Sequence, residues 1–387
     1  MIILDSPYVS DLLLESIRQE NWPVLENEFS RNIESIRQQR IGETAFERLF
    51  QEGAMVYSNT ENSITWVRKH FPGSDYERLV SLFKDKYEFR LAIQSAFPTY
   101  WFMRENLSTL EAIPLEELRF PFVLKPAVGF MSIGVSYVEN ELQWNEVIRN
   151  TKEQMRQLEG VFPQEVVGSQ QFLLEQWMPG EEYAIDVFYD KPGKPNVVNM
   201  MKHYFASDAD VSDRLYITSS TIIREQMPVF QDFLEKLGEL LGIRQFPLHI
   251  ELRHDGDNVF PIEVNPMRFA GWGTTDLAQF AYGINPYKCL FDEQTPNWEK
   301  ALAGKEDKVY GLMVIERPSK FDISQIEDFD YELLEKSLEK PLMIRRIDFR
   351  KFPIFAFVFT ETRIGNFSEL ENLLKSDLSE FIRLKQS

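Results

Sequence analysis

Residues 248–265 read LHIELRHDGDNVFPIEVN and are the most informative segment of the chain. The Asp-Gly pair at 255–256 favours a tight turn between two runs that alternate apolar and polar residues, which predicts a β-hairpin. Successive side chains of a strand point to opposite faces. Any register that pairs apolar with apolar residues therefore places Glu251, Glu263 and Asn265 on one polar face. Such oxygen ligands suit Mg²⁺, which usually takes one or two carboxylates and leaves its other positions to water and phosphate. Taken alone, an ordinary solvated hairpin face explains the pattern equally well.

Residues 120–138 read FPFVLKPAVGFMSIGVSYV. They predict a buried strand that ends in Lys125, then a loop of small residues, then a second strand. Such a loop lets backbone N–H groups approach phosphate oxygens, and the lysine adds a positive charge. The segment is neither a Walker A loop nor a dinucleotide-binding fingerprint, because neither glycine spacing is present. A plain hairpin with one exposed lysine is the alternative.

Residues 172–188 read FLLEQWMPGEEYAIDVF. They predict an apolar strand ending at Glu175, a turn at 179–180, and a second strand that leaves through Glu182. Free backbone groups at the end of a strand can bind the edge of an adenine ring. Glu175 is placed to accept from the exocyclic amine of adenine, and Glu182 from ribose hydroxyls. A hairpin with a polar end is again the alternative.

The order of these three segments resembles the ATP-grasp superfamily of carboxylate ligases, over about residues 80–290. The combination is specific, whereas no single motif is. The resemblance implies an ATP-grasp fold of two α+β subdomains, with ATP and Mg²⁺ as cofactors and Mn²⁺ as the alternative metal. By this resemblance the ATP-binding residues are Lys86, Lys125, Ser132, Glu175, Trp177, Met178, Glu182 and Lys202, the metal ligands are Glu251, Glu263 and Asn265, and the catalytic residues are Lys125 and Arg268.

The sequence departs from the family pattern beside Arg268. The family often reads Asn-Pro-Arg, whereas here Met267 stands before the arginine. The loop after Lys125 is also less rich in glycine than in the biotin carboxylase branch, which argues against that branch. His203 and Arg214 are further basic candidates for contact with a phosphate or a substrate carboxylate. For these two residues, as for Lys202, a surface salt bridge is the alternative.

Composition limits the partners of the chain. At 387 residues with 43% hydrophobic and 13% aromatic residues, the chain is long enough for two or three packed domains. A formal charge of −19 disfavours nucleic acid, because phosphate backbones require clustered Lys and Arg. Bound ATP would likewise need Mg²⁺ to offset its charge in this acidic background.

Other residue counts point to a soluble cytoplasmic protein. The single cysteine, Cys289, excludes an intrachain disulfide framework and a Cys-cluster metal site. The four histidines show no zinc spacing. The first residues predict a short strand, not a signal peptide, because no basic segment precedes a long apolar stretch. No run of about 18 apolar residues predicts a membrane span.

The chain divides into three predicted domains. Residues 1–83 alternate strand and helix and predict a small α/β layer with a parallel sheet. Residues 84–293 form the predicted ATP-grasp domain, which includes an amphipathic helix over 228–241. Residues 294–387 predict a small α+β domain in which no chemistry is recognised. A lid, a homodimer face and a docking surface for a carrier protein are all open for it.

Three loops are candidates for substrate contact. Residues 6–10 and 58–62 each follow a predicted strand of the N-terminal domain, where open α/β sheets tend to bind ligands. Helix capping is the alternative role for both loops. Residues 269–276 form a small-residue loop after the metal ligands, and we expect contacts to the acceptor substrate there. The alternative is a turn followed by a helix cap at Thr275 or Asp276.

The resemblance implies an ATP-dependent carboxylate ligase that releases ADP. A small-molecule carboxylate attacks the γ-phosphorus and gives an acyl phosphate, which an amine or thiol acceptor then displaces. Arg268 is expected to stabilise the oxyanion formed in that second step. Two alternatives stay open: an ATP-binding module without ligation, and a small-molecule kinase on the same scaffold.

Overall fold

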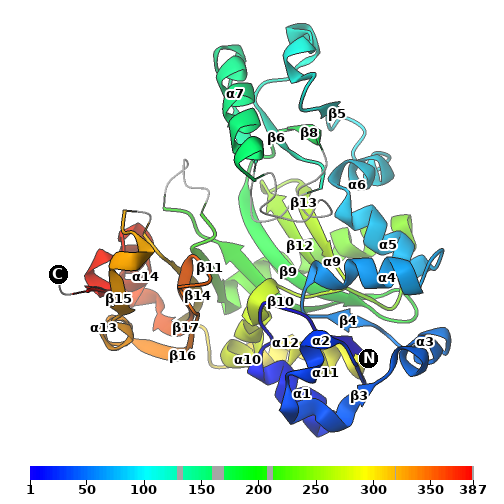
Figure 1. Ribbon diagram of the computed structural model, residues 1–387, viewed down its shortest axis with the longest axis vertical. Helices are drawn as coiled ribbons and strands as arrows, with labels where there is room; N and C mark the ends of the chain where they lie inside the picture. Colours follow the sequence, from blue (N-terminus) through cyan, green and yellow to red (C-terminus); the bar gives the residue numbers. More distant parts are fainter. Residues whose placement is uncertain (129–133, 159–169, 207–211, 319, 386–387) are drawn as a thin grey trace.

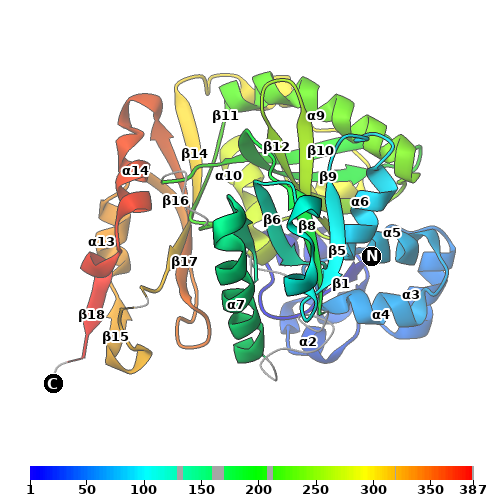
Figure 2. The same cartoon turned by 90° about the horizontal axis from the view of Figure 1, so that it is seen from above.

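The computed structural model describes every residue except 129–133, 159–169, 207–211, 319 and 386–387. Three lobes surround a central sheet, and the chain passes from the blue N-terminal lobe through the cyan and green lobe to the red C-terminal lobe (Figure 1). Seen from above, the small cyan and green lobe lies over one part of this sheet, and α9 runs across one face of the sheet (Figure 2). None of the described helices is long and apolar enough to cross a membrane.

The N-terminal lobe contains a parallel sheet, as the sequence predicts. Its four strands are ordered β3-β2-β1-β4, and each neighbouring pair is parallel. A buried apolar cluster packs the strands against the helices. The strands are β1 (Ile2–Ile3), β2 (Val24–Leu25), β3 (Arg40–Ile41) and β4 (Tyr57–Ser58), and the helices are α1 (Asp11–Glu20), α2 (Glu28–Arg31), α3 (Glu43–Gln51), α4 (Ile64–His70) and α5 (Asp75–Lys84), with 3-10 turns η1 (Glu34–Gln39) and η2 (Glu61–Ser63).

A small antiparallel sheet forms the core of the second lobe. Its strands are ordered β5-β8-β6-β7, and a separate apolar cluster lies between the sheet and helix α7. Helix α6 leads into this lobe from α5. The elements are α6 (Lys86–Ile93), β5 (Phe102–Asn106), η3 (Leu110–Ala112), η4 (Leu115–Glu117), β6 (Phe122–Pro126), β7 (Ser136–Val138), α7 (Glu141–Leu158) and β8 (Gln171–Gln176).

A large antiparallel sheet joins the rest of the chain. Its eight strands are ordered β13-β12-β9-β10-β11-β14-β17-β16. The predicted boundary at residue 294 is not a break in this sheet, because β14 pairs with β11 along its length. The strands are β9 (Glu181–Tyr189), β10 (Pro195–His203), β11 (Leu215–Ser219), β12 (Phe246–His254), β13 (Val259–Pro266), β14 (Lys308–Glu316), β16 (Lys340–Arg346) and β17 (Ile354–Arg363).

The remaining elements cover this sheet or extend its C-terminal end. A second apolar cluster lies under the C-terminal helices. The remaining elements are η5 (Gly271–Asp276), α10 (Leu277–Tyr282), α11 (Pro286–Phe291), α12 (Trp298–Leu302), η6 (Ile323–Gln325), β15 (Ile326–Phe329), α13 (Tyr331–Lys336), η7 (Ile364–Asn366), α14 (Ser368–Lys375), η8 (Ser379–Phe381) and β18 (Ile382–Leu384).

Helix α9 (Ser220–Leu241) packs on the apolar face of the large sheet and begins well before the predicted residue 228. Pro228 lies inside this helix, although an interior proline removes a backbone hydrogen bond. The helix buries Ile223, Phe230 and Leu234, and Phe230 contacts Tyr183 of β9 edge to face. Burial of this apolar face offsets the free-energy cost of the missing hydrogen bond. The helix therefore continues through Pro228, where the sequence predicted that it begins.

The segment 172–188 is not a hairpin, because its two strands belong to different sheets. β8 lies in the small sheet and β9 in the large one, so residues 177–180 carry the chain from one lobe to the next. Gly180 has a φ of 96° in this crossing. A Cβ at this position would stand 2.3 Å from the carbonyl oxygen of His254. The crossing is therefore packed directly against the end of β12.

We predict that Gly180→Ala destabilises the protein more than Gly256→Ala. Both glycines have positive φ, 96° and 101°, but a Cβ at Gly256 would meet no atom within 4 Å. Backbone strain alone should cost about 1 kcal/mol, and strain with overlap about 3 kcal/mol. Thermal unfolding followed by circular dichroism measures both variants. Equal unfolding temperatures would contradict the prediction.

Candidate active site

The hairpin of β12 and β13 places the three predicted metal ligands on one face. Glu251 pairs directly with Glu263, and His249 pairs with Asn265, so all four side chains share a face of the large sheet. Residues directly opposite in antiparallel strands have Cβ atoms about 5 Å apart. Burial raises the pKa of Glu251, and the neighbouring Glu263 carboxylate raises it further, while His249 opposes the shift. Two carboxylates so close together favour a bound cation.

The donor set at this position fits Mg²⁺. It consists of two carboxylates and one amide oxygen, and hard oxygen ligands of this number are what Mg²⁺ takes from proteins. Within the described parts of the chain, no group of three or more His, Cys, Asp and Glu side chains could hold a metal. The site therefore differs from an all-protein metal cage, and suits a metal that also binds water and phosphate.

Two predicted lysines reach the same hairpin from the small lobe. The Nζ atom of Lys86 lies 3.2 Å from Oε2 of Glu263. The backbone N–H of Lys86, at the start of α6, donates to the carbonyl of Ala127 just after β6. The Nζ atom of Lys125, the penultimate residue of β6, donates to the backbone oxygen of Ile262 at 3.3 Å. The structure thus brings Lys86 to the Glu263 carboxylate and Lys125 to the backbone of the same hairpin, and their role in binding phosphate stays a prediction.

A β-bulge explains why Ile262 is available. Glu251 pairs with Glu263 and Leu252 with Pro261, so Ile262 is the extra residue between them. Its carbonyl accepts from Lys125 and also from Nη2 of Arg90 at 2.9 Å. The bulge on this edge strand therefore anchors two cations of the small lobe.

Glu175 links these two cations. Its Oε1 lies 2.5 Å from Nζ of Lys125, and its Oε2 lies 2.6 Å from Nε of Arg90. All three side chains are buried. Burial alone would raise the pKa of Glu175, but Arg90 and Lys125 lower it to about 2. Its predicted hydrogen bond to the adenine amine stays a prediction.

Sequence reasoning missed Arg90, although a signal was present. Arg90 follows Lys86 by one helical turn on α6, so both side chains lie on the same face of that helix. Lys86 and Arg90 are both buried in the structure. The spacing Lys-x-x-x-Arg before the lysine-bearing strand could have identified a second cation.

Trp177 and Met178 lie in the crossing between the lobes and Glu182 follows at the start of β9, while their predicted contacts with adenine and ribose stay predictions. Arg253 joins these residues. Its guanidinium lies 4.1 Å from the centre of the Trp177 ring, Nη1 donates to the Met178 carbonyl at 3.0 Å, and Nη2 lies 3.0 Å from Oε2 of Glu182. Nδ1 of His203 lies 3.2 Å from the other oxygen of Glu182.

Charge keeps Glu182 ionised at this position. Burial would raise the pKa of Glu182, but His203 and Arg253 lower it. Sequence reasoning assigned no role to Arg253. Arg253 lies two residues after Glu251 and therefore on the same face of β12, because side chains alternate along a strand. This spacing could have identified Arg253 from the sequence.

Among the described residues, one predicted ATP-binding residue is not brought into this arrangement. Lys202 pairs across the strands with Tyr183, whose face is opposite to that of Glu251, and its side chain bonds Glu181. Ser132 lies outside the described residues. Arg214, a further candidate, donates to the carbonyls of Leu374 and Ser376 and so ties β11 to the C-terminal lobe.

A buried aspartate lies on the strand next to the predicted metal ligands, opposite His249. Asp186 accepts from Nδ1 of His249 at 2.8 Å, from Asn199 at 3.0 Å and from the backbone N–H of Ala270 at 2.7 Å. Nε2 of His249 lies 3.7 Å from Glu251. Burial opposes the charge of His249, but the Asp186 and Glu251 carboxylates raise its pKa to about 9. Sequence reasoning missed Asp186, because only the fold places it beside His249.

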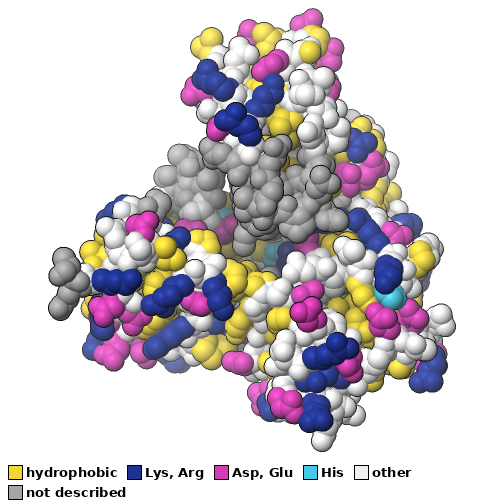
Figure 3. All heavy atoms as spheres, in the orientation of Figure 1, with side chains coloured by type: hydrophobic (Ala, Val, Ile, Leu, Met, Phe, Trp, Pro, Cys, Tyr) yellow, Lys and Arg dark blue, Asp and Glu magenta, His cyan; other side chains and the backbone are white. Residues whose placement is uncertain are grey.

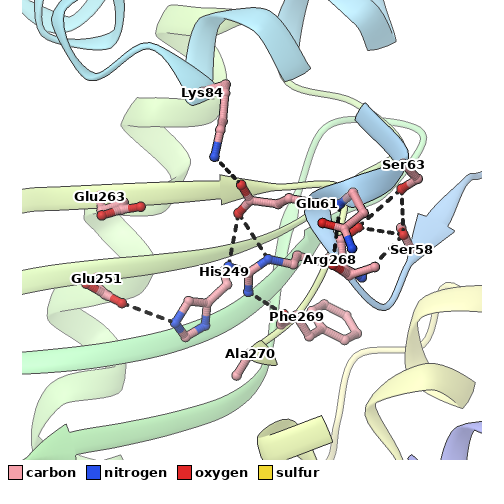
Figure 4. Close-up of polar contacts among 12 residues, drawn as sticks. Ser58, Glu61, Ser63, Lys84, His249, Glu251, Glu263, Arg268, Phe269 and Ala270 are labelled. Atoms are coloured by element: carbon pink, nitrogen blue, oxygen red, sulfur yellow. Dashed lines mark hydrogen bonds and ion pairs between the residues drawn. The ribbon is translucent and has the colours of Figure 1, made fainter. Parts of the chain in front are cut away.

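Arg268 lies at the end of the same hairpin and bonds Glu61 of the N-terminal lobe (Figure 4). The space-filling view shows a hollow between the lobes with acidic, basic and histidine side chains on its floor (Figure 3). The hairpin thus contributes both the carboxylates and Arg268, whereas Lys86 comes from α6 and Lys125 from β6.

The loop 269–276 joins the N-terminal lobe to the C-terminal lobe. Asp276 makes no side-chain cap to α10; instead it accepts from Arg345 at 2.7 Å, from Ser10 at 2.5 Å and from Tyr287 at 3.1 Å. The cap predicted as the alternative is therefore wrong for Asp276. Arg345 of β16 also donates to the Trp272 carbonyl at 2.6 Å. The C-terminal lobe thus supplies a cation that sequence reasoning did not recognise.

Comparisons with known proteins agree with this architecture. Residues 118–276 match the family model of the ATP-grasp domain. No curated protein matches the chain by sequence. The solved structures that resemble it include L-amino acid ligase from Bacillus licheniformis, with a TM-score of 0.67 and 17% identity over 100% of this chain and 98% of that one.

Two further structures share the fold. N5-carboxyaminoimidazole ribonucleotide synthetase from Thermotoga maritima has a TM-score of 0.65 and 11% identity, over 100% of this chain and 99% of that one. The biotin carboxylase domain of Hydrogenobacter thermophilus 2-oxoglutarate carboxylase, solved with MgADP, ADP and bicarbonate, has a TM-score of 0.62 and 13% identity, over 99% of this chain and 90% of that one. With the lysine-tipped strand and the carboxylate hairpin in their expected order, the family match confirms the resemblance over its own range: residues 118–276 of the chain match an ATP-grasp domain.

Proposed function

We propose that this protein is an ADP-forming, ATP-dependent ligase that joins a carboxylic acid to an amine, with a thiol as the alternative acceptor. The observation that carries the proposal is the meeting of Lys86 and Lys125 with the strand that bears Glu263. Positive charge from one lobe and metal-type ligands from the other face a common space, which is the arrangement that phosphoryl transfer from a nucleotide requires.

The nucleotide would lie between the lobes. Glu182, held by Arg253 and His203, accepts from ribose hydroxyls, while the backbone of Trp177 and Met178 meets the adenine edge. Lys86 and Lys125 bind phosphate oxygens. Glu251, Glu263 and Asn265 would hold Mg²⁺, which when bound neutralises charge on the transferred phosphoryl group. A solved relative of the same fold contains MgADP, which supports this assignment.

The reaction follows from these charges in two steps. A carboxylate oxygen of the substrate attacks the γ-phosphorus in line, a P–O bond forms, and ADP leaves. The amine nitrogen then attacks the acyl carbon, so that a C–N bond forms, the nitrogen loses a proton to solvent, and phosphate departs as the acyl C–O bond breaks. Arg268 donates N–H groups to the negative oxygen of that second step. No protein nucleophile is needed, because the activated acyl group stays on phosphate.

Two observations support an amine as the acceptor: the reactivity of acyl phosphates and the description of one similar structure. An acyl phosphate reacts readily with amines, and the Bacillus licheniformis structure is described as an L-amino acid ligase. The loop 269–276, which joins the N-terminal and C-terminal lobes through Ser10, Asp276 and Arg345, is our candidate for contact with the acceptor. We therefore propose amino acids as the first substrates to screen.

ADP release tests the function directly. The protein is incubated with MgATP, a panel of amino acids and other carboxylic acids, and either amines or hydroxylamine. We expect carboxylate-dependent ADP release together with a hydroxamate, because only an acyl phosphate reacts with hydroxylamine in this way. ADP release with a stable phosphorylated product and no hydroxamate would show a kinase instead.

Glu263→Gln should abolish turnover while the fold is retained. Loss of one metal-ligating carboxylate removes several kcal/mol of transition-state stabilisation, so we expect ADP release to fall by at least about 100-fold. Asp257→Asn, in the exposed turn of the same hairpin, is the matched control and should keep full activity. Unchanged ADP release in Glu263→Gln would show that the metal ligands are wrongly assigned.

Lys125→Met and Lys202→Met should behave differently, because of these two lysines only Lys125 reaches the hairpin, through the carbonyl of Ile262. We expect kcat/KM for ATP to fall by about 100-fold in Lys125→Met. In Lys202→Met it should change by less than about twofold, because Lys202 forms a surface ion pair with Glu181. Circular dichroism checks that Lys125→Met still folds, since Glu175 keeps Arg90 as a partner. An equal effect of the two substitutions would place the phosphates elsewhere.

A further inference from the structure

We propose that Glu61 of the N-terminal lobe is a positioning residue that orients Arg268 for the transferred phosphoryl group. This inference rests on the proposed function, because it assumes that Arg268 faces the reacting phosphate. It assigns a role in the chemistry to a lobe that otherwise contributes only loops.

The backbone before Arg268 is fixed by the N-terminal lobe. Met267, the residue that departs from the family pattern, is fully buried and has a φ of 58°. A left-handed conformation is unfavourable for a side chain of this kind and persists only where neighbouring contacts impose it. One such contact is the backbone N–H of Ser58, which donates to the Met267 carbonyl at 2.8 Å. The extra residue thus turns the chain toward β4 before Arg268 leaves the hairpin.

The side chain of Arg268 is held at three nitrogen atoms. Nε and Nη2 lie 3.1 and 3.0 Å from Oε1 of Glu61, and Nη1 donates to the Phe269 carbonyl at 3.0 Å (Figure 4). A planar guanidinium bound along its Nε–Nη2 edge by a carboxylate has little rotational freedom. Contacts of this kind fix where the remaining N–H groups point.

Glu61 is itself held in place. Its Oε2 accepts from Nζ of Lys84 at 2.6 Å, and both side chains are largely buried. Burial alone would raise the pKa of Glu61, but Arg268 and Lys84 lower it to about 2. The turn that carries it is closed by the Ser63 hydroxyl, which donates to the Ser58 hydroxyl at 2.7 Å. The carboxylate is therefore a charged, rigid support.

The charge balance leaves a positive site. One carboxylate is shared between Arg268 and Lys84, so the group retains a net positive charge beside the hairpin. Glu61 therefore orients the arginine without cancelling the attraction of this region for a phosphoryl group. A contact that served only to join two lobes would have no effect on binding at the hairpin.

Binding of a phosphoryl mimic tests the proposal without a known acceptor. Isothermal titration calorimetry measures the affinity of the full-length protein for MgADP alone and for MgADP with aluminium fluoride, which mimics the phosphoryl group in transfer. The variants are Glu61→Gln, Arg268→Met and the double substitution. Glu20→Gln is the matched control, because Glu20 forms an ion pair with Lys288 between the N-terminal lobe and α11, away from the hairpin.

We expect Glu61→Gln to bind MgADP within about twofold of the unmodified protein and the aluminium fluoride complex about tenfold more weakly. Arg268→Met should show at least the same selective loss, and the double variant should be no weaker than Arg268→Met, because Glu61 acts through the arginine. Glu20→Gln should change neither affinity. Thermal unfolding confirms that each variant is folded.

Other results overturn the inference in distinguishable ways. If Arg268→Met weakens the aluminium fluoride complex and Glu61→Gln does not, Glu61 only joins the lobes, and the proposed function stands. Additive losses in the double variant would show that Glu61 acts independently of Arg268. Tighter binding in Glu61→Gln would show that Glu61 restrains the arginine. If the unmodified protein does not bind MgADP, the proposed function fails, and this inference with it.

Discussion

Two like charges set opposite each other across adjacent strands are the constraint on which the site depends. Glu251 and Glu263 face one another in the hairpin, and such a pair is unfavourable unless positive charge is close. Lys86 beside Glu263 and His249 beside Glu251 supply part of that charge. The two carboxylates therefore favour binding of a further cation at this end of the large sheet, and the metal ion of a metal-bound nucleotide would be such a cation.

The same hairpin also connects the two lobes that enclose this space. The bulge at Ile262 presents a carbonyl to Arg90 and Lys125, and Glu175 holds those cations together in a buried triad. A buried ion pair is costly when one partner is lost, so the triad fixes the approach of the small sheet more than it adds stability. The geometry of the proposed phosphate site and the position of the small lobe on the large sheet are thus set by the same contacts.

The sequence predicted those parts of the site that depend on local pattern. Strand alternation around the Asp-Gly turn was sufficient to place Glu251, Glu263 and Asn265 on one face. Contacts between distant segments left no such pattern, so Arg345, Asp186 and Glu61 were not recognised. Lys202 shows how one residue changes the result: without the bulge near Val198 in β10, it would pair with Glu182 and lie on the site face.

Continuity of the large sheet has a consequence for the C-terminal part of the chain. β14 is hydrogen-bonded to β11 over five successive residue pairs, with β17 and β16 beyond it. Shortening the chain at residue 293 would leave β11 as a bare edge strand with unpaired N–H and C=O groups. Such an edge invites pairing with other molecules, so a truncated form should self-associate through β11 and not survive as a minimal catalytic unit.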